Sequence, residues 1–302
     1  MPDLPALPAP TPVITVHPVT LPAPGRGDDL QVRICAPTTG TELPVIVLSH
    51  GYHQSALGYD PLAGFWAAHG FVVVQPTHLD SLALGLAPDD PRTPLIWSLR
   101  VDDLVRTLDG LDVLEAAVPG LAGRVDRTRI AVAGHSWGAQ TAGMLLGARV
   151  LDADGTPGED RSDARVTAGV LLAVTGTGGA DLSPFAAEHF PFMSPGYVHL
   201  TTPTLVVAGD QDDSPLSVRG PDWFTDAYHL SPGARGLLIL TGAQHSLGGI
   251  TGHASTETTD ESPERVALVQ RVTWAFLREA LGLKDSTWPV PVDAALGSLA
   301  SR

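Results

Sequence analysis

The 302-residue chain has little cysteine, little positive charge and no long apolar run. Its one cysteine, Cys35, excludes an intramolecular disulfide, and the strand-like stretch around it predicts a packed core thiol. With 18 basic against 33 acidic residues, the formal net charge is −15, which would repel phosphate backbones and anionic lipid headgroups. We therefore expect a small neutral molecule as partner, and neither nucleic acid nor a membrane.

No segment approaches the length of an apolar membrane span. Residues 1–12 contain five prolines and have neither the basic nor the apolar region of a signal peptide. The expected location is therefore cytoplasmic, with secretion possible only if a leader has been removed from the sequence.

Strand-like and helix-like segments alternate from about residue 45 to residue 281, with no linker rich in Ser, Gly or charge between them. This alternation predicts one α/β unit. We assign residues 13–285 to a single domain that follows a Pro-rich N-terminal segment (1–12) and precedes a C-terminal tail (286–302). The length also leaves room for a substantial core.

Continuous apolar runs predict buried strands, and apolar residues at a helical period predict helices. The expected strands cover residues 13–17, 30–36, 44–49, 71–75, 129–133, 168–174, 204–208 and 236–240. The expected helices cover residues 60–69, 99–118, 140–149 and 263–281. The first two strands are expected to be antiparallel at the edge of the sheet. Residues 77–94 lack periodicity and would form an excursion that shapes a pocket.

A short apolar strand runs into Gly-His-Ser-Trp-Gly at residues 134–138 and then into a helical pattern. G-x-S-x-G in this setting is the sequence form of a nucleophile elbow, a sharp turn that holds its serine in a strained backbone conformation. Side chains at Gly134 and Gly138 would collide with neighbouring backbone. The pattern therefore predicts an exposed nucleophile at Ser136.

A serine hydroxyl is a weak nucleophile at neutral pH, so it needs a base and a group that orients the base. Two later predicted strands end in such residues: strand 204–208 precedes several aspartates, and strand 236–240 precedes His245. Ligand sites of open α/β sheets lie at the carboxyl ends of the strands, so the fold would bring these residues to Ser136. The order Ser, acid, His is the one found in α/β-hydrolases.

Three neighbouring aspartates could orient the histidine. We favour Asp212, which lies far enough from the strand end to reach the histidine loop, whereas Asp210 would brace the turn. Asp213 is the second choice. His253 is a weaker alternative to His245, because no strand immediately precedes it.

The oxyanion of acyl transfer needs backbone donors, typically the N–H after the nucleophile and one from the loop after the third strand. These correspond to Trp137 and Tyr52, and Gly51 would allow a close backbone approach. We expect Gly51, His53, His135, Thr175 and Phe190 to line the substrate site. The His and Asp residues near this loop lack the spacing of known metal motifs, so no metal is expected.

Several of these residues resemble a known family. His50-Gly51-Tyr52, the run from Ala68 to Val74 and the elbow look like the chlorophyllase, platelet-activating-factor acetylhydrolase and polyester hydrolase (cutinase-like) branch of the α/β-hydrolases, over about residues 44–281. The resemblance implies an α/β-hydrolase fold, a mostly parallel central sheet with helices on both faces and no large lid domain. It also implies Asp212 and His245 as partners of Ser136 and oxyanion donors at Tyr52 and Trp137.

Three departures from the relatives bear on the substrate. Polyester hydrolases of this kind usually carry an aromatic clamp residue where this chain has Thr175 followed by a Gly-rich run, and they often use C-terminal disulfides, which one cysteine cannot form. Plant chlorophyllases have a basic residue in place of Trp137. We therefore expect neither polyester nor chlorophyll cleavage as the native activity.

The expected function is a cofactor-independent serine carboxylic ester hydrolase that acts through an acyl-enzyme on small or medium neutral esters. A lactonase, an acyltransferase or a polyester hydrolase could use the same residues, and a non-catalytic binding protein could keep the fold. The expected assembly is a monomer or a small homo-oligomer. Activity should rise with pH as His245 loses its proton.

Overall fold

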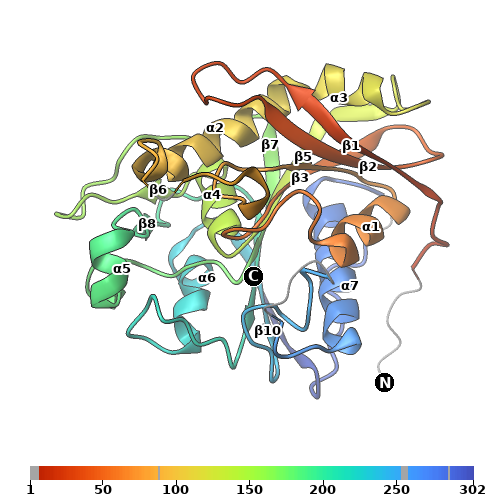
Figure 1. The fold of residues 1–302 in the computed structure, drawn as a ribbon. Coiled ribbons are helices and arrows are strands. Elements are labelled where there is room, and N and C mark those ends of the chain that lie inside the picture. The colour runs from red at the N-terminus through yellow and green to blue at the C-terminus, as the bar shows by residue number, and fades with distance from the viewer. Residues whose placement is uncertain (1–6, 88, 253–257, 285) are drawn as a thin grey trace.

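The computed structural model describes residues 7–87, 89–252, 258–284 and 286–302. In these residues nine strands form one sheet in the order β1-β2-β4-β3-β5-β7-β9-β10-β11 (Figure 1). Their bounds are β1 Val13–Leu21, β2 Leu30–Pro37, β3 Leu43–Ser49, β4 Val72–Pro76, β5 Val125–His135, β7 Val166–Leu172, β9 Thr204–Gly209, β10 Ala234–Leu240 and β11 Gly297–Ser301. The strands from β4 to β10 run parallel, and β1, β2 and β11 pair antiparallel. A separate antiparallel pair joins β6 (Arg149–Val150) to β8 (Pro195–Gly196).

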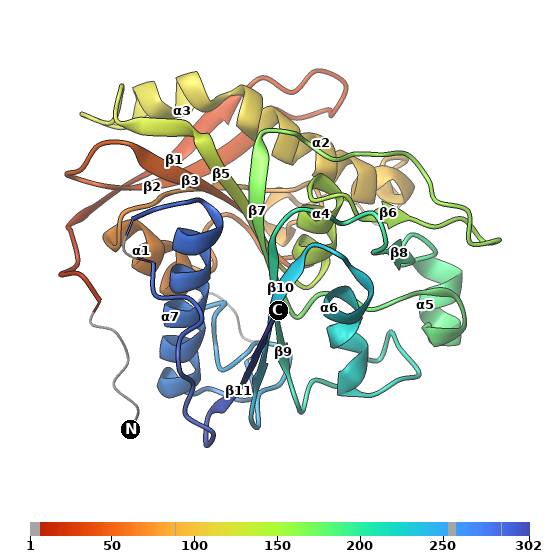
Figure 2. The same cartoon turned by 180° about the vertical axis from the view of Figure 1, so that it is seen from behind.

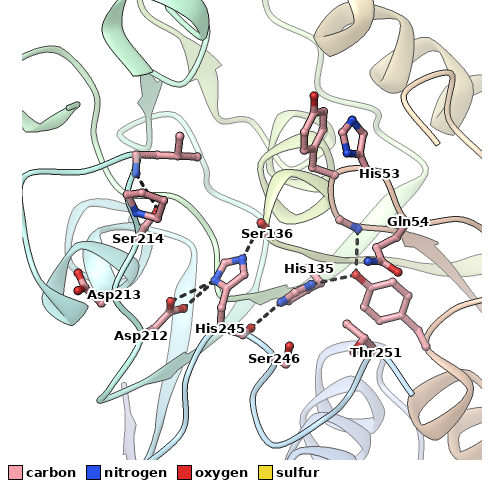
Figure 3. A pocket seen from close by; sticks show the side chains of 15 residues that line it. His53, Gln54, His135, Ser136, Asp212, Asp213, Ser214, His245, Ser246 and Thr251 are labelled. Carbon is pink, nitrogen blue, oxygen red and sulfur yellow. Dashed lines mark hydrogen bonds and ion pairs between the residues drawn. The ribbon is translucent and has the colours of Figure 1, made fainter. Parts of the chain in front are cut away.

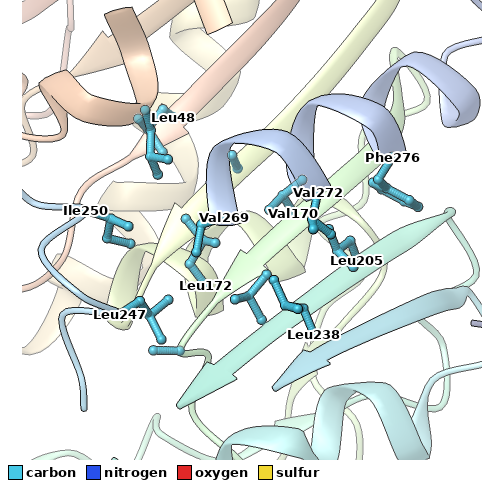
Figure 4. Close-up of a cluster of buried hydrophobic side chains, with 14 of the residues drawn as sticks. Leu48, Val170, Leu172, Leu205, Leu238, Leu247, Ile250, Val269, Val272 and Phe276 are labelled. Atoms are coloured by element: carbon cyan, nitrogen blue, oxygen red, sulfur yellow. The ribbon is translucent and has the colours of Figure 1, made fainter. Parts of the chain in front are cut away.

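Helices cover both faces of the sheet because the central strands are apolar on both sides (Figures 1 and 2). One face packs against α1 (Asp60–Ala68) and α7 (Pro263–Ala280), where Val269, Val272 and Phe276 of α7 lie over strand residues such as Leu205 (Figure 4). The opposite face packs against α2 (Ile96–Asp109), α3 (Leu111–Ala117) and α4 (Trp137–Leu145). Two shorter helices complete the fold, α5 (Pro184–His189) and α6 (Asp226–Leu230).

The expected fold class is confirmed: the sheet is mostly parallel, with helices on both faces. Cys35 is a buried free thiol in β2, as expected, and β1 lies at the sheet edge beside β2. No helix of the described residues is both long and apolar enough to cross a membrane. The proposed domain limits stay a prediction, and residues 1–6 of the Pro-rich segment lie outside the described residues.

Two predicted helices have different bounds. The helix expected at 99–118 is two helices, because α2 ends at Asp109 and α3 begins at Leu111, with Gly110 between them. A Cβ atom at Gly110 would lie 2.6 Å from a methyl carbon of Leu21. The helix expected at 140–149 begins earlier, directly after Ser136, and ends at Leu145. Its last predicted turn is replaced by Gly147, whose φ of +111° does not fit a helix.

The C-terminal residues contain a strand that the sequence analysis did not predict. Residues 297–301, within the predicted tail, form β11 and pair with β10 from Gly236 to Leu240. Arg302 adds side-chain hydrogen bonds to the carbonyl oxygens of Ala234 and Ser231. The tail therefore contributes an edge strand next to the strand that precedes His245.

Candidate active site

Ser136 lies at the sharp turn between β5 and α4, with φ 56° and ψ −124°. A side chain at this φ is strained, as the elbow motif predicts. The two flanking glycines allow close packing: a Cβ at Gly134 would lie 2.1 Å from the carbonyl oxygen of Gly138, and a Cβ at Gly138 would lie 2.2 Å from that of Ser49. Only glycine fits at these two positions, and together they hold the serine at the carboxyl end of β5.

Ser136, His245 and Asp212 form a chain of hydrogen bonds (Figure 3). The Oγ of Ser136 lies 2.8 Å from Nε2 of His245. The Nδ1 of the same ring lies 2.9 Å and 3.2 Å from the two carboxylate oxygens of Asp212. Asp212 is fully buried, whereas the side chain of His245 is 44% exposed. The arrangement orients the imidazole and leaves its Nε2 at the serine, open to a substrate.

The two neighbouring aspartates, Asp210 and Asp213, occupy other positions than the one beside the His245 ring. Asp210 accepts a hydrogen bond from the backbone N–H of Gly242 at 2.7 Å, so it braces the turn after β10. Asp213 is exposed and lines the cavity in front of Ser136 without a hydrogen bond to His245 among those of the described residues. His253, the alternative base, lies outside the described residues.

The loop after β3 brings Tyr52 to the elbow. The rings of Tyr52 and Trp137 lie 5.4 Å apart, and both residues line the cavities near Ser136. The backbone N–H of Gly51 donates to the hydroxyl of Tyr59 at 2.9 Å, and a Cβ at Gly51 would lie 3.1 Å from that oxygen. The glycine therefore permits the close packing that holds this loop beside the serine.

His135 connects this loop to the histidine loop. Its Nδ1 lies 2.9 Å from the hydroxyl of Tyr59, and its Nε2 lies 2.8 Å from the carbonyl oxygen of His245. Burial, with a smaller contribution from His245, lowers the pKa of His135 to about 3. The ring is therefore neutral, and because Nε2 faces a carbonyl it must carry the proton, while Nδ1 accepts from Tyr59.

A buried polar network lies beneath the Tyr52 loop, and sequence reasoning missed it. Arg100 of α2 contacts both carboxylate oxygens of Asp80 and donates to the carbonyl oxygen of His50. Asp80 accepts from the backbone N–H of His53 at 3.2 Å. Burial alone would raise the pKa of Asp80, but the charge of Arg100 reverses this and holds it below its usual value. The network fixes the backbone on both sides of Tyr52.

The buried histidines of this network are neutral. Burial and then the charge of Arg100 lower the pKa of His50 to about 4 and place that of His78 well below its usual value. His78 lies 3.0 Å from Asp103 through Nδ1 and 2.9 Å from Ser49 through Nε2. Within the described residues, no group of three His, Cys, Asp or Glu side chains could hold a metal ion.

Two cavities meet at Tyr52 and His53. The first, of about 360 Å³, contains Ser136 and His245. The second, of about 710 Å³, lies beside it. Of the predicted lining residues, Gly51, His53 and His135 line the first cavity and Phe190 lines the second.

Thr175, the fifth residue predicted to line the substrate site, lines neither of these two cavities. Its side chain is buried and its Oγ1 donates to Gln140 at 3.3 Å. The chain turns at Ala173, where φ is +45°, and carries Thr175 under the first turn of α4. Thr175 is therefore a packing residue of the elbow helix.

Comparison with known proteins gives one family match. Residues 26–149 match the family described as Chlorophyllase, a segment that includes the Tyr52 loop and the elbow and ends before Asp212 and His245. No curated protein is similar enough to the chain to count as a match. The matched family supports an esterase-type hydrolase at the level of the family. The mostly parallel sheet and this match are consistent with an α/β-hydrolase fold, and residues 26–149 are similar to the chlorophyllase family.

Proposed function

We propose that the protein is a serine carboxylic ester hydrolase that works through an acyl-enzyme on neutral esters. The observation that carries the proposal is the hydrogen-bonded chain from Ser136 through His245 to the buried Asp212, with Ser136 at a strained elbow. The charge of −15 makes anionic substrates poor candidates.

In the proposed reaction, Ser136 Oγ attacks the ester carbonyl carbon while His245 Nε2 takes its proton. The carbonyl oxygen becomes an oxyanion, which the backbone N–H groups of Tyr52 and Trp137 stabilise. His245 then gives the proton to the leaving alcohol, and the acyl group stays on Ser136. Water repeats the sequence with the acyl-enzyme, so that the acid leaves and Ser136 recovers its proton. Asp212 keeps the imidazole in the tautomer that this cycle needs.

A serine-reactive phosphonate and a chromogenic short-chain ester test the proposal together. We expect a covalent adduct at Ser136, located by mass spectrometry of peptides, and loss of nearly all turnover in Ser136→Ala. Ser298→Ala is the matched control, because Ser298 is exposed on β11 and lines neither cavity. A folded protein without an adduct or turnover would instead favour the non-catalytic binding protein.

The same acyl-enzyme could pass its acyl group to an alcohol or an amine, or open a lactone. Product analysis with added acceptors separates these activities. Hydrolysis that outruns transfer in water supports the proposal, and transfer that outruns hydrolysis would make the protein an acyltransferase.

A further inference from the structure

The larger cavity has a wall of aromatic rings that starts at the proposed oxyanion residues. The Trp137 ring stacks on Phe192 at 5.2 Å, and Trp97 continues the stack at 6.4 Å. Phe190 meets Phe192 edge-on at 6.0 Å and Tyr52 at 6.4 Å. Rings that offer both faces and edges suit another aromatic group better than a flexible chain.

Hydrogen bonds and a cation–π contact from neighbouring segments hold this aromatic wall in place. Gln140, in the first turn of α4, donates to the carbonyl oxygen of Phe192 at 2.8 Å, which ties the segment after α5 to the elbow helix. Arg100 lies over the Trp137 ring at 4.8 Å, and Leu82 donates its N–H to the carbonyl oxygen of His53 at 3.2 Å. The cavity is therefore a built feature of the fold, of a size typical of ligand sites.

The charges along the larger cavity disfavour an anion. Asp80 is neutralised by Arg100, and the exposed Glu188 adds a negative charge at the rim. The apolar lining and this rim together favour a neutral aromatic group.

The smaller cavity differs in its lining. Beside Ser136 and His245 it is lined by the polar side chains of Gln54, Asp213, Ser214, Ser246 and Thr251 and by Tyr59, Pro215 and Leu216. The rings of Trp137, Phe190 and Phe192, which form the wall of the larger cavity, do not line it. Figure 3 shows Asp213 and Ser214 on the His245 side of Ser136, and His53 on the opposite side. The two cavities share only Tyr52 and His53 among their described lining residues.

The proton path of the proposed reaction assigns each half of the ester to a cavity. The leaving oxygen must lie at Nε2 of His245, since that atom protonates it. The alcohol thus extends over the residues that flank His245. With the carbonyl oxygen at the proposed donors Tyr52 and Trp137 and the leaving oxygen at His245, the larger cavity beside Tyr52 and Trp137 is the space left for the acyl carbon chain.

We propose that the aromatic cavity binds the acyl group, so that the preferred substrates are esters of a bulky aryl-substituted acid with a small alcohol. This inference rests on the proposed function, and it assigns the specificity of that site to Phe190 and Phe192 on one side and to the 213–216 segment on the other.

Two isomeric esters test the assignment: ethyl 2-naphthylacetate carries the naphthyl group on the acyl side, and 2-naphthylmethyl propanoate carries it on the alcohol side. Both release an unactivated primary alcohol. We expect kcat/KM to be at least about tenfold higher for ethyl 2-naphthylacetate, a ratio that a well-packed aromatic contact supports. Equal rates, the reverse order, or turnover of small esters without turnover of either isomer would overturn the assignment.

Two variants test which residues cause the selectivity between the two isomeric esters. Phe190→Ala is expected to reduce the selectivity ratio severalfold, because it removes one ring of the wall. Phe185→Ala is the matched control: Phe185 is 57% exposed and contacts Phe190 at 5.8 Å, but it does not line the cavity. An unchanged ratio in Phe190→Ala would also overturn the assignment. Phosphonate labelling at Ser136 keeps the two proposals apart, since a labelled enzyme with the wrong preference refutes only the specificity.

Discussion

Arg100 and Asp80 form a buried ion pair beneath the loop that carries Tyr52, with Nη1 of Arg100 at 2.6 Å and 2.7 Å from the two carboxylate oxygens. Each partner also holds the loop backbone, Arg100 at the carbonyl of His50 and Asp80 at the N–H of His53. Tyr52 lies between these two attachment points. The pair therefore fixes the direction of the Tyr52 N–H, which is the proposed oxyanion donor.

Arg100→Lys should impair the reaction more than it impairs folding. A lysine keeps the charge but cannot contact Asp80 and the His50 carbonyl with a rigid fork. We expect kcat to fall roughly 10- to 100-fold, because a misplaced oxyanion donor loses transition-state stabilisation. The measurement is steady-state kinetics on a short-chain ester, with urea denaturation to verify folding.

Arg106→Lys serves as the control for that experiment. Arg106 lies on the same helix and contacts Asp103 at 3.5 Å, away from the Tyr52 loop. If both variants keep full activity, the ion pair has no role in positioning the loop.

Asp212→Asn and Asp213→Asn should differ strongly in activity. Asp212 is buried and contacts Nδ1 of His245, whereas Asp213 is exposed. An amide at position 212 would offer an N–H to the imidazole and favour the wrong tautomer, so we expect kcat to fall about 10³- to 10⁴-fold. The same change at position 213 should cost less than about tenfold. Similar losses in the two variants would contradict the choice of Asp212.

Two glycine-to-alanine changes should have opposite effects on stability. In Gly138→Ala the new Cβ would lie 2.2 Å and 2.5 Å from the backbone carbonyl oxygens of Ser49 and His50, so we expect a loss of about 3 kcal/mol or more in the free energy of unfolding. Gly64 lies inside α1, and its Cβ would meet nothing within 4 Å. Gly64→Ala should therefore stabilise the protein by about 0.5–1 kcal/mol. Urea denaturation of both variants decides whether the elbow is as tightly packed as described.

Stability should fall as the pH drops from 7 to 5. Burial lowers the pKa of His50 to about 4 and that of His135 to about 3, and the pKa of His78 is also well below its usual value. Unfolding returns these rings to an ordinary pKa near 6.5, so below that pH the unfolded chain binds more protons and the free energy of unfolding decreases. The loss by pH 5 is roughly 2 kcal/mol each for His50 and His135, and His78 acts in the same direction.

Protonation of Asp103 has the opposite effect on the free energy of unfolding. Burial raises its pKa to about 6 against the pull of Arg26, so the folded protein takes up a proton there between pH 7 and pH 5 and gains roughly 1 kcal/mol. The net effect is still a loss, because three rings outweigh one carboxyl. Urea denaturation at both pH values measures it, and His135→Gln should reduce the pH dependence, with the exposed His199→Gln as control. A stability that stays level or rises toward pH 5 would contradict the neutral histidines.

The sequence pattern was sufficient to predict the position of a candidate site residue wherever that residue follows an apolar strand. The strands before Ser136, Asp212 and His245 are apolar in their carboxyl-terminal parts, so their order along the chain and the rule for parallel sheets bring the three residues together. The structure places them within hydrogen-bonding distance.

Pairings across long stretches of sequence could not be predicted in this way. Arg100 and Asp80 come from a helix and from an aperiodic loop, and nothing in either segment identifies the partner. The strand at 297–301 has one large apolar residue, so it gives no strand signal. The contact of Thr175 with Gln140 also joins segments that are far apart in the sequence.

The strand β11 also bears on how the protein can be handled. It covers the free backbone edge of β10, and the exposed residues of β11 are small or polar. Deleting residues 297–302 would uncover a row of unpaired N–H and C=O groups on an apolar strand, which is a template for strand addition between molecules. Truncated protein should therefore aggregate during expression, although the deletion removes none of the proposed catalytic residues.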